Sequence, residues 1–238
     1  MKAIFTATLM ILLGHLAVAA EPAKPKLGEL PVSRILYLGN SITLHAPAPH
    51  IGWTGNWGMA ASAKEKDYVH LLTADIAKTA KTQPETMVRN IADFERGHAM
   101  YDIAEQLKPE LDFHADLIIL AIGENVAESA SDESRDTYRA AFSKLIDELK
   151  SHGSPTIFVR SSFWPNPAKD EIMRDVAEKA GATFVDISKL GRDEVNAARA
   201  ERKFEHDGVA GHPGDKGMRA IADALFADIK KRSTQAGK

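Results

Sequence analysis

The chain has 238 residues, of which 44% are hydrophobic and 26% are charged, with a formal net charge of −3 and no cysteine. The lack of cysteine excludes disulfides, thiol catalysis and thiolate metal sites. The slightly acidic balance gives no support for binding to nucleic acid or to an anionic membrane. A chain of this length suits one globular α/β domain.

The first twenty residues have the pattern of a secretory signal peptide. Lys2 gives a positive start, an apolar stretch follows, and positions 17–19 fit a small-x-small cleavage site. A membrane anchor is the alternative, but the apolar stretch is shorter than the ~20 residues that span a bilayer, and His15 interrupts it. We therefore expect residues 1–20 to be a signal peptide, the protein to be secreted or periplasmic, and the mature chain to have no membrane span.

The segment that follows the predicted signal peptide has the composition of a linker. Residues 21–31 carry three prolines and few apolar side chains, which predicts a poorly ordered N-terminal tether. Neither an internal repeat nor a second linker follows. Residues 32–232 are therefore predicted to form a single domain.

Within this domain, short apolar runs alternate with segments of helical apolar spacing. Predicted strands cover residues 33–38, 86–89, 116–122, 155–160 and 183–187. Predicted helices cover residues 67–80, 100–107, 134–151, 170–180, 193–203 and 215–231, with Pro109 expected to end the second of them. The alternation predicts an α/β fold with a parallel five-stranded sheet between two layers of helices. Functional residues are expected where the strands end.

Four segments bring chemically useful residues to that edge of the predicted sheet. Ser41 follows the first strand, Asn90 ends the second, and Asn125 follows the third. Asp207 and His212 precede the last helix. A serine, a histidine, an acid and amide donors are the groups that acyl transfer requires.

The same segments resemble the conserved blocks of the SGNH hydrolase superfamily, which includes the GDSL-like lipases and esterases. Gly39-Asn40-Ser41-Ile42-Thr43 is similar to the first block, Gly123-Glu124-Asn125 to the Gly-x-Asn block, and His212-Pro213 to the terminal histidine block. The resemblance implies a flavodoxin-like three-layer α/β/α fold and ester hydrolysis without a metal or an organic cofactor. The α/β-hydrolases match less well, because the chain has no Gly-x-Ser-x-Gly motif.

The resemblance also implies roles for individual residues. Ser41 would be the nucleophile and His212 its base. Asn125, the Ser41 amide and a donor at or near Asn90 would form the oxyanion hole. The family usually places an acid three residues before the histidine, but position 209 is valine, so Asp207 is the nearest candidate to orient His212. Glu205 and a backbone carbonyl are the alternatives.

Three tryptophans are candidates for substrate contact. Trp53 and Trp57 lie in a glycine-rich loop after the nucleophile, and Trp164 follows the fourth strand. Flat aromatic faces suit sugar rings, although packing within the loop would explain the first two equally well. His45 and His50 lack a carboxylate partner at metal-ligand spacing, so no metal site is predicted.

Together these features predict a secreted serine esterase, or carboxylic ester hydrolase, that hydrolyses acyl esters through an acyl-enzyme. An acetyl ester on a carbohydrate is the favoured substrate, and a glycan or a small-molecule ester is the expected partner. Two alternatives remain at this point. One is a glycan O-acyltransferase that uses the same serine, and the other is a non-catalytic glycan-binding module with the same fold.

Overall fold

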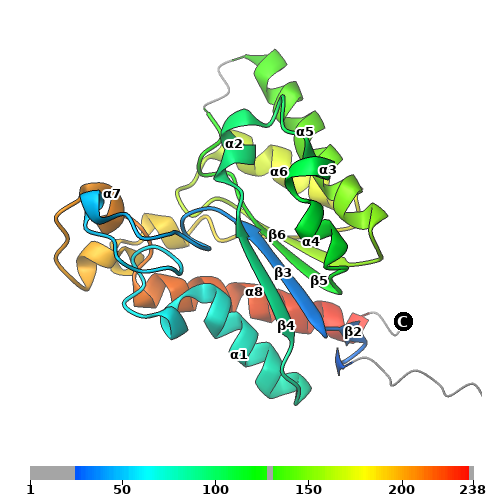
Figure 1. Cartoon of the computed structure of the whole chain (residues 1–238), viewed down its shortest axis with the longest axis horizontal. Helices are drawn as coiled ribbons and strands as arrows, with labels where there is room; N and C mark the ends of the chain where they lie inside the picture. The colour runs from blue at the N-terminus through cyan, green and yellow to red at the C-terminus, as the bar shows by residue number, and fades with distance from the viewer. Residues whose placement is uncertain (1–24, 128–130, 236–238) are drawn as a thin grey trace, which may run out of the picture.

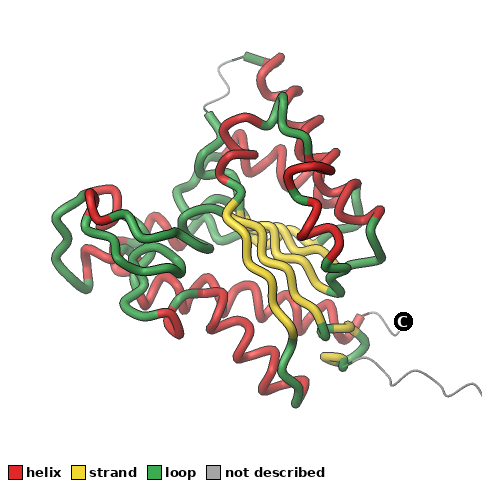
Figure 2. The backbone as a smooth tube through the Cα atoms, in the orientation of Figure 1, coloured by secondary structure: helices red, strands yellow, loops and turns green. Residues whose placement is uncertain are grey.

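The computed structural model describes residues 25–127 and 131–235. The predicted signal peptide, residues 1–20, and residues 21–24 of the predicted tether lie outside this part of the chain. Figure 1 shows a central sheet with helices on both of its faces, and Figure 2 shows the strands side by side between the helical layers. The α/β/α architecture predicted from the sequence is confirmed.

The central sheet has five parallel strands in the order β4-β3-β5-β6-β7. These strands are β3 (Arg34–Gly39), β4 (Glu85–Asn90), β5 (Leu117–Ala121), β6 (Thr156–Arg160) and β7 (Thr183–Val185). Leu36 of β3 pairs with Met87 of β4 on one side and with Ile118 of β5 on the other. All residues of the central strand β5 are buried, which explains why its sequence is apolar throughout. The strand order is that of flavodoxin-like folds.

The helices differ in length and in place. The long ones are α1 (Tyr68–Ala80), α5 (Asp132–Ser151), α6 (Pro167–Lys179) and α8 (Asp215–Gln235). The short ones are α2 (Ala92–Gly97), α3 (Ile103–Gln106), α4 (Lys108–Asp112) and α7 (Asp207–Ala210). Helices α1 and α8 cover one face of the sheet, and α2 to α6 cover the other (Figure 1).

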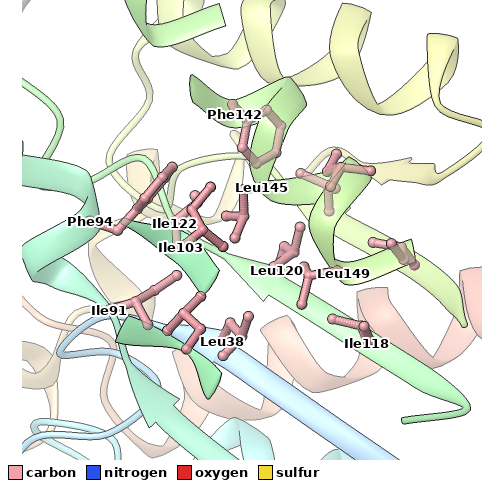
Figure 3. Close-up of a cluster of buried hydrophobic side chains, with 14 of the residues drawn as sticks. Leu38, Ile91, Phe94, Ile103, Ile118, Leu120, Ile122, Phe142, Leu145 and Leu149 are labelled. Carbon is pink, nitrogen blue, oxygen red and sulfur yellow. The ribbon is translucent and has the colours of Figure 1, made fainter. Parts of the chain in front are cut away.

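Two hydrophobic cores follow from the alternation of side chains along each strand. Leu36 and Leu38 of β3 enter the core beneath α5, where Phe142 and Leu145 are fully buried (Figure 3). The intervening Ile35 and Tyr37 enter the opposite core, against α1 and α8. A shift of register by one residue would exchange these two sets, so the pattern fixes the pairing of the strands.

Part of the predicted tether is structured. Lys26–Leu27 (β1) and Leu30–Pro31 (β2) form an antiparallel hairpin, and the Glu29 amide donates to the Ser233 carbonyl of α8 at 3.1 Å. Leu27 and Leu30 are 4% and 3% exposed and belong to the core against α8. The prolines suggested a linker, but burial of these two leucines attaches the segment to the domain.

Two predictions about the helices are wrong. Residues 193–203 do not form a helix. They make two single 3₁₀ turns, Glu194–Asn196 and Ala198–Ala200. A continuous helix is interrupted between the turns, where the Ala198 amide donates to the His212 carbonyl and the Asn196 carbonyl accepts from the Gly214 amide. Pro109 does not end a helix but lies in the first turn of α4, where its missing N–H costs nothing.

Candidate active site

The carboxyl ends of the strands point toward the side of the molecule on which α7 lies (Figure 1). Ser41 lies just beyond β3, and His212 lies between α7 and α8. The Oγ atom of Ser41 is 2.8 Å from the Nε2 atom of His212, although 171 positions separate them in the chain. The sequence-based pairing of these two residues therefore agrees with the geometry.

The other ring nitrogen of His212 determines which atom can act as the base. Nδ1 is 2.6 Å from the carbonyl oxygen of Gly208. A carbonyl only accepts hydrogen bonds, so Nδ1 carries the proton. In the neutral ring Nε2 is then unprotonated and accepts the hydrogen bond from the Ser41 hydroxyl. This is the tautomer that a general base requires.

Gly208, and not Asp207, orients the imidazole. Asp207 is an exposed residue that begins the single turn of α7, and its carbonyl accepts from the Gly211 amide. That turn brings the Gly208 carbonyl, four residues before His212, to Nδ1. The predicted role of Asp207 is replaced by the backbone-carbonyl alternative. Glu205, the other candidate, is also exposed.

The surroundings of His212 favour its neutral form. Burial lowers its pKa below the ordinary value of 6.5, and nearby His45 adds to this effect. The bond to Gly208 and the charge of Glu124 oppose the shift without reversing it. The ring of Trp164 packs edge to face on His212, with 5.1 Å between ring centroids. Trp164 thus helps to exclude water from the imidazole while remaining 39% exposed.

The turn that presents Ser41 depends on a glycine and an asparagine. A Cβ atom at Gly39 would lie 1.9 Å from Oγ1 of Thr43. The buried Asn40 then closes the turn, since its carbonyl accepts from the amides of Thr43 and Leu44 and its side chain accepts from Ile42. The hydroxyl is left at the tip of a rigid turn.

Asn125 follows β5 and lines the same cavity as Ser41. Gly123, two residues earlier, has a φ of +122°, a backbone conformation that only glycine adopts without strain. The Asn125 side chain donates from Nδ2 to Oε2 of Glu95 at 2.8 Å. Its second Nδ2 hydrogen is available for a ligand in the cavity.

Asn90 lines the cavity but is occupied with holding the loops together. Its side chain donates to the Leu44 carbonyl at 2.7 Å and accepts from the Ala92 amide at 2.9 Å. The neighbouring Ile91 amide donates to the Gly39 carbonyl. Neither the Ile91 nor the Ala92 amide is therefore free to donate to an oxyanion. Like Asn125, however, Asn90 keeps a second Nδ2 hydrogen beside the cavity, so its role as an oxyanion donor stays a prediction.

Two of the three tryptophans pack inside the loop after Ser41. Trp53 is 6% exposed and donates to the His45 carbonyl, and Trp57 donates to the Ala61 carbonyl. Their rings meet edge to face with 5.5 Å between centroids. The packing interpretation explains both, and Trp164 is the one candidate of the three whose ring packs on His212.

The cavity beside Ser41 has a volume of about 450 Å³. Its lining is completed by side chains of three segments, namely His45, Ile51 and Met59 of the loop after Ser41, Ala92, Asp93 and Arg96 of α2, and His206 and Val209 at α7. Among residues 25–127 and 131–235, no group of three histidine or acidic side chains could hold a metal ion. In the same part of the chain, no helix has the length and apolarity needed to cross a membrane.

A buried charge cluster beneath the site did not follow from the sequence. Glu124 accepts from Arg160 at 2.6 Å, from the Phe163 amide at 2.8 Å and from the Asn40 side chain at 2.6 Å. Burial disfavours its charge, but the fully buried Arg160 holds the pKa of Glu124 below its usual range. The one signal in the sequence was an arginine at the end of an otherwise apolar strand.

Comparisons with known proteins agree with this geometry. The family model described as "GDSL-like Lipase/Acylhydrolase family" matches residues 37–220. A search of curated proteins finds no match.

Solved structures share the fold at low sequence identity. A putative GDSL-like lipase from Bacteroides ovatus is 16% identical, with a TM-score of 0.56 over 84% of this chain and 99% of that one. A family two carbohydrate esterase from Cellvibrio japonicus is 18% identical, with a TM-score of 0.52 over 89% and 63%. An active-site mutant of a family two carbohydrate esterase from Clostridium thermocellum is 14% identical, with a TM-score of 0.54 over 85% and 64%.

The family match covers most of the chain and includes Ser41, Asn125 and His212. The strand order, the serine at the end of β3 and the histidine near the C-terminus are the features that the family resemblance implied. The chain belongs to the GDSL-like lipase/acylhydrolase family and is a serine ester hydrolase.

Proposed function

We propose that the protein is an exported esterase that removes acyl groups, acetyl foremost, from carbohydrates through a Ser41 acyl-enzyme. The observation that carries the proposal is the bond between Ser41 Oγ and His212 Nε2, with the proton of the imidazole held on Nδ1 by Gly208. A serine that is merely a helix cap would not need a neutral histidine in this tautomer.

The first half of the reaction forms the acyl-enzyme. His212 Nε2 takes the hydroxyl proton as Ser41 Oγ bonds to the ester carbonyl carbon. The Gly208 carbonyl stabilises the resulting imidazolium through Nδ1–H. His212 then returns the proton to the leaving alcohol oxygen as the ester C–O bond breaks.

The negative charge on the carbonyl oxygen requires donors at the moment of attack. The Ser41 amide and the second Nδ2 hydrogen of Asn125 are the proposed donors, each worth ~10²–10³ in turnover. Water then attacks the acyl-enzyme with His212 again as the base. This step releases the carboxylic acid and restores Ser41.

Two features support a carbohydrate ester as the substrate. Trp164 presents a partly exposed aromatic ring beside His212, and such rings bind sugar faces. Two structural neighbours are family two carbohydrate esterases. Export, which rests on the signal-peptide pattern of residues 1–20, would bring the enzyme to extracellular or cell-wall glycans.

An acetyl-release assay tests this proposal. The purified protein is incubated with acetylated xylan, acetylated cell-wall glycan and p-nitrophenyl acetate, with and without an acceptor sugar, and Ser41→Ala serves as the control. We expect acetate release from an acetylated glycan that Ser41→Ala does not catalyse. Preference for long-chain lipid esters would contradict the substrate assignment, and acetylation of the acceptor would identify the acyltransferase instead.

A further inference from the structure

Glu95 in α2 is a buried carboxylate for which the sequence analysis predicts no role. It is fully buried, yet it accepts four hydrogen bonds. Oε1 accepts from the Gly123 amide at 2.6 Å, from the Asn125 amide at 3.1 Å and from the Asn40 side chain at 3.3 Å. Oε2 accepts from Nδ2 of Asn125 at 2.8 Å. A single carboxylate thus contacts the segments that follow β3 and β5.

Arg96, the next residue of α2, contacts the oxygen of the Asn125 side-chain amide, whose nitrogen contacts Glu95. Its Nη2 atom donates to Oδ1 of Asn125 at 3.0 Å. The side-chain amide of Asn125 is therefore held between the Glu95 carboxylate at Nδ2 and the Arg96 guanidinium at Oδ1. Rotating the amide by 180° would place the NH₂ group against the guanidinium and the oxygen against the carboxylate, and both contacts would be repulsive.

We propose that Glu95, together with Arg96, is a positioning residue that fixes the Asn125 amide so that its remaining N–H points to the oxyanion. This inference rests on the proposed function, because it assigns Glu95 a part in stabilising the transition state. Glu95 does not touch the reacting atoms and acts only through Asn125. A donor that is already oriented stabilises the oxyanion without reorganisation during the reaction.

The neighbouring charges bear on how Glu95 performs this role. Glu124 follows β5, Arg160 ends β6, and Tyr138 in α5 is also close enough to interact electrostatically. Burial, followed by repulsion from Glu124, raises the pKa of Glu95 above its ordinary value. Four donated hydrogen bonds oppose that rise and favour the carboxylate. Substitution of Glu95 by glutamine is therefore a test of acceptor geometry as much as of charge.

The Glu95→Gln variant has a defined structural consequence. A glutamine offers one oxygen and one NH₂ group. If its oxygen stays with the Gly123 and Asn125 amides, its NH₂ group faces Nδ2 of Asn125, and two donors meet. Asn125 must then turn, and its N–H is lost from the oxyanion position.

The test compares kcat and KM of four variants with the wild type on p-nitrophenyl acetate. They are Glu95→Gln, Asn125→Ala, the double variant and Glu110→Gln, which is a matched control because Glu110 is a buried α4 carboxylate paired with Arg89. We expect Asn125→Ala to lower kcat by ~10²–10³-fold. Glu95→Gln should lower kcat at least tenfold with KM little changed, the double variant should match Asn125→Ala, and Glu110→Gln should keep the wild-type kcat.

Other outcomes would overturn the inference in different ways. A Glu95→Gln enzyme with wild-type kcat, or with a raised KM alone, shows that Glu95 does not act on the transition state. A double variant whose losses multiply shows that Glu95 acts independently of Asn125. If Glu95→Gln does not fold, Arg96→Gln takes its place in the test, because Arg96 is exposed and its substitution should leave the fold intact. A several-fold loss of kcat that disappears in the Asn125→Ala background supports the inference, and no loss overturns it. An inactive wild type would refute the proposed function itself.

Discussion

The Nδ1 atom of His212 lies 2.6 Å from the carbonyl oxygen of Gly208 and donates a hydrogen bond to it. A peptide carbonyl carries only a partial negative charge, so it fixes the tautomer and the orientation of the ring more than it stabilises the imidazolium. The proposed nucleophile and base therefore consist of two side chains, Ser41 and His212, with a backbone carbonyl of α7 in the place of a third.

This arrangement predicts that the acid at position 207 is dispensable. Asp207→Asn should retain kcat within about twofold of the wild type, and so should Glu205→Gln, because neither carboxylate bonds to His212. His212→Ala should instead lose ~10⁴–10⁶-fold, the range seen when members of a catalytic triad are removed. Steady-state kinetics on p-nitrophenyl acetate measures all three. A loss in Asp207→Asn comparable to that in His212→Ala would contradict the role given to Gly208.

The environment of His212 predicts the pH dependence of the reaction. The base must be neutral, and burial lowers its pKa below 6.5. Activity should therefore rise with pH through a midpoint below 6.5 and then reach a plateau. A pH profile of kcat/KM reports this pKa in the free enzyme. A midpoint above 6.5 would mean that the nearby charge of Glu124 outweighs burial and His45.

Trp164 should affect binding of the sugar more than the chemical step. Trp164→Ala removes an exposed ring beside His212, so KM for an acetylated oligosaccharide should rise by roughly 2–10-fold, as expected for ~0.5–1.5 kcal/mol of aromatic contact. The KM for p-nitrophenyl acetate should change less. Trp53→Phe is the control, because Trp53 is buried in the loop. Equal changes in both variants would contradict the assignment of Trp164 to the substrate.

Gly39 should be intolerant of a side chain. In Gly39→Ala the new Cβ would meet Oγ1 of Thr43 at 1.9 Å, and Thr43 cannot move freely because it is buried and bonded to Tyr68 at 2.7 Å. The free energy of unfolding should fall by about 1–3 kcal/mol or more. Thermal unfolding measures this, at roughly 2–4 °C per kcal/mol.

A glycine in open surroundings provides the comparison. Gly97 at the end of α2 has no atom within 4 Å of an added Cβ. Gly97→Ala should leave the melting temperature unchanged or raise it slightly. If Gly39→Ala and Gly97→Ala have the same melting temperature, the close contact at Gly39 does not limit stability.

Most of the fold, but only part of the candidate active site, could be predicted from the sequence. The apolar run of β5 and the helical spacing of α5 depend on local patterns, so both were predictable. The 3₁₀ turns around Asn196 were not, because the Asn196 carbonyl accepts from Gly214, a partner that only the tertiary structure provides. Ser41, Asn125 and His212 could be named from short motifs that recur in the family.

The supporting residues of the site depended on geometry that no motif records. Gly208 acts through its carbonyl, which every residue has, and it reaches His212 only because residues 207–210 form a helical turn. Asn90 was named as an oxyanion donor by its position, but that its side chain also links Leu44 to Ala92 could not be predicted from the sequence. Glu95 belongs to a helix that the sequence-based prediction did not contain.

Activation of Ser41 by His212 can be measured by labelling with a fluorophosphonate, followed by mass spectrometry of the intact protein and of its peptides. We expect one covalent adduct on Ser41 in the wild type, none in Ser41→Ala, and much slower labelling in His212→Ala. A wild-type protein that takes up no label, or that carries the label on another residue, would contradict the assignment of Ser41 as a nucleophile activated by His212.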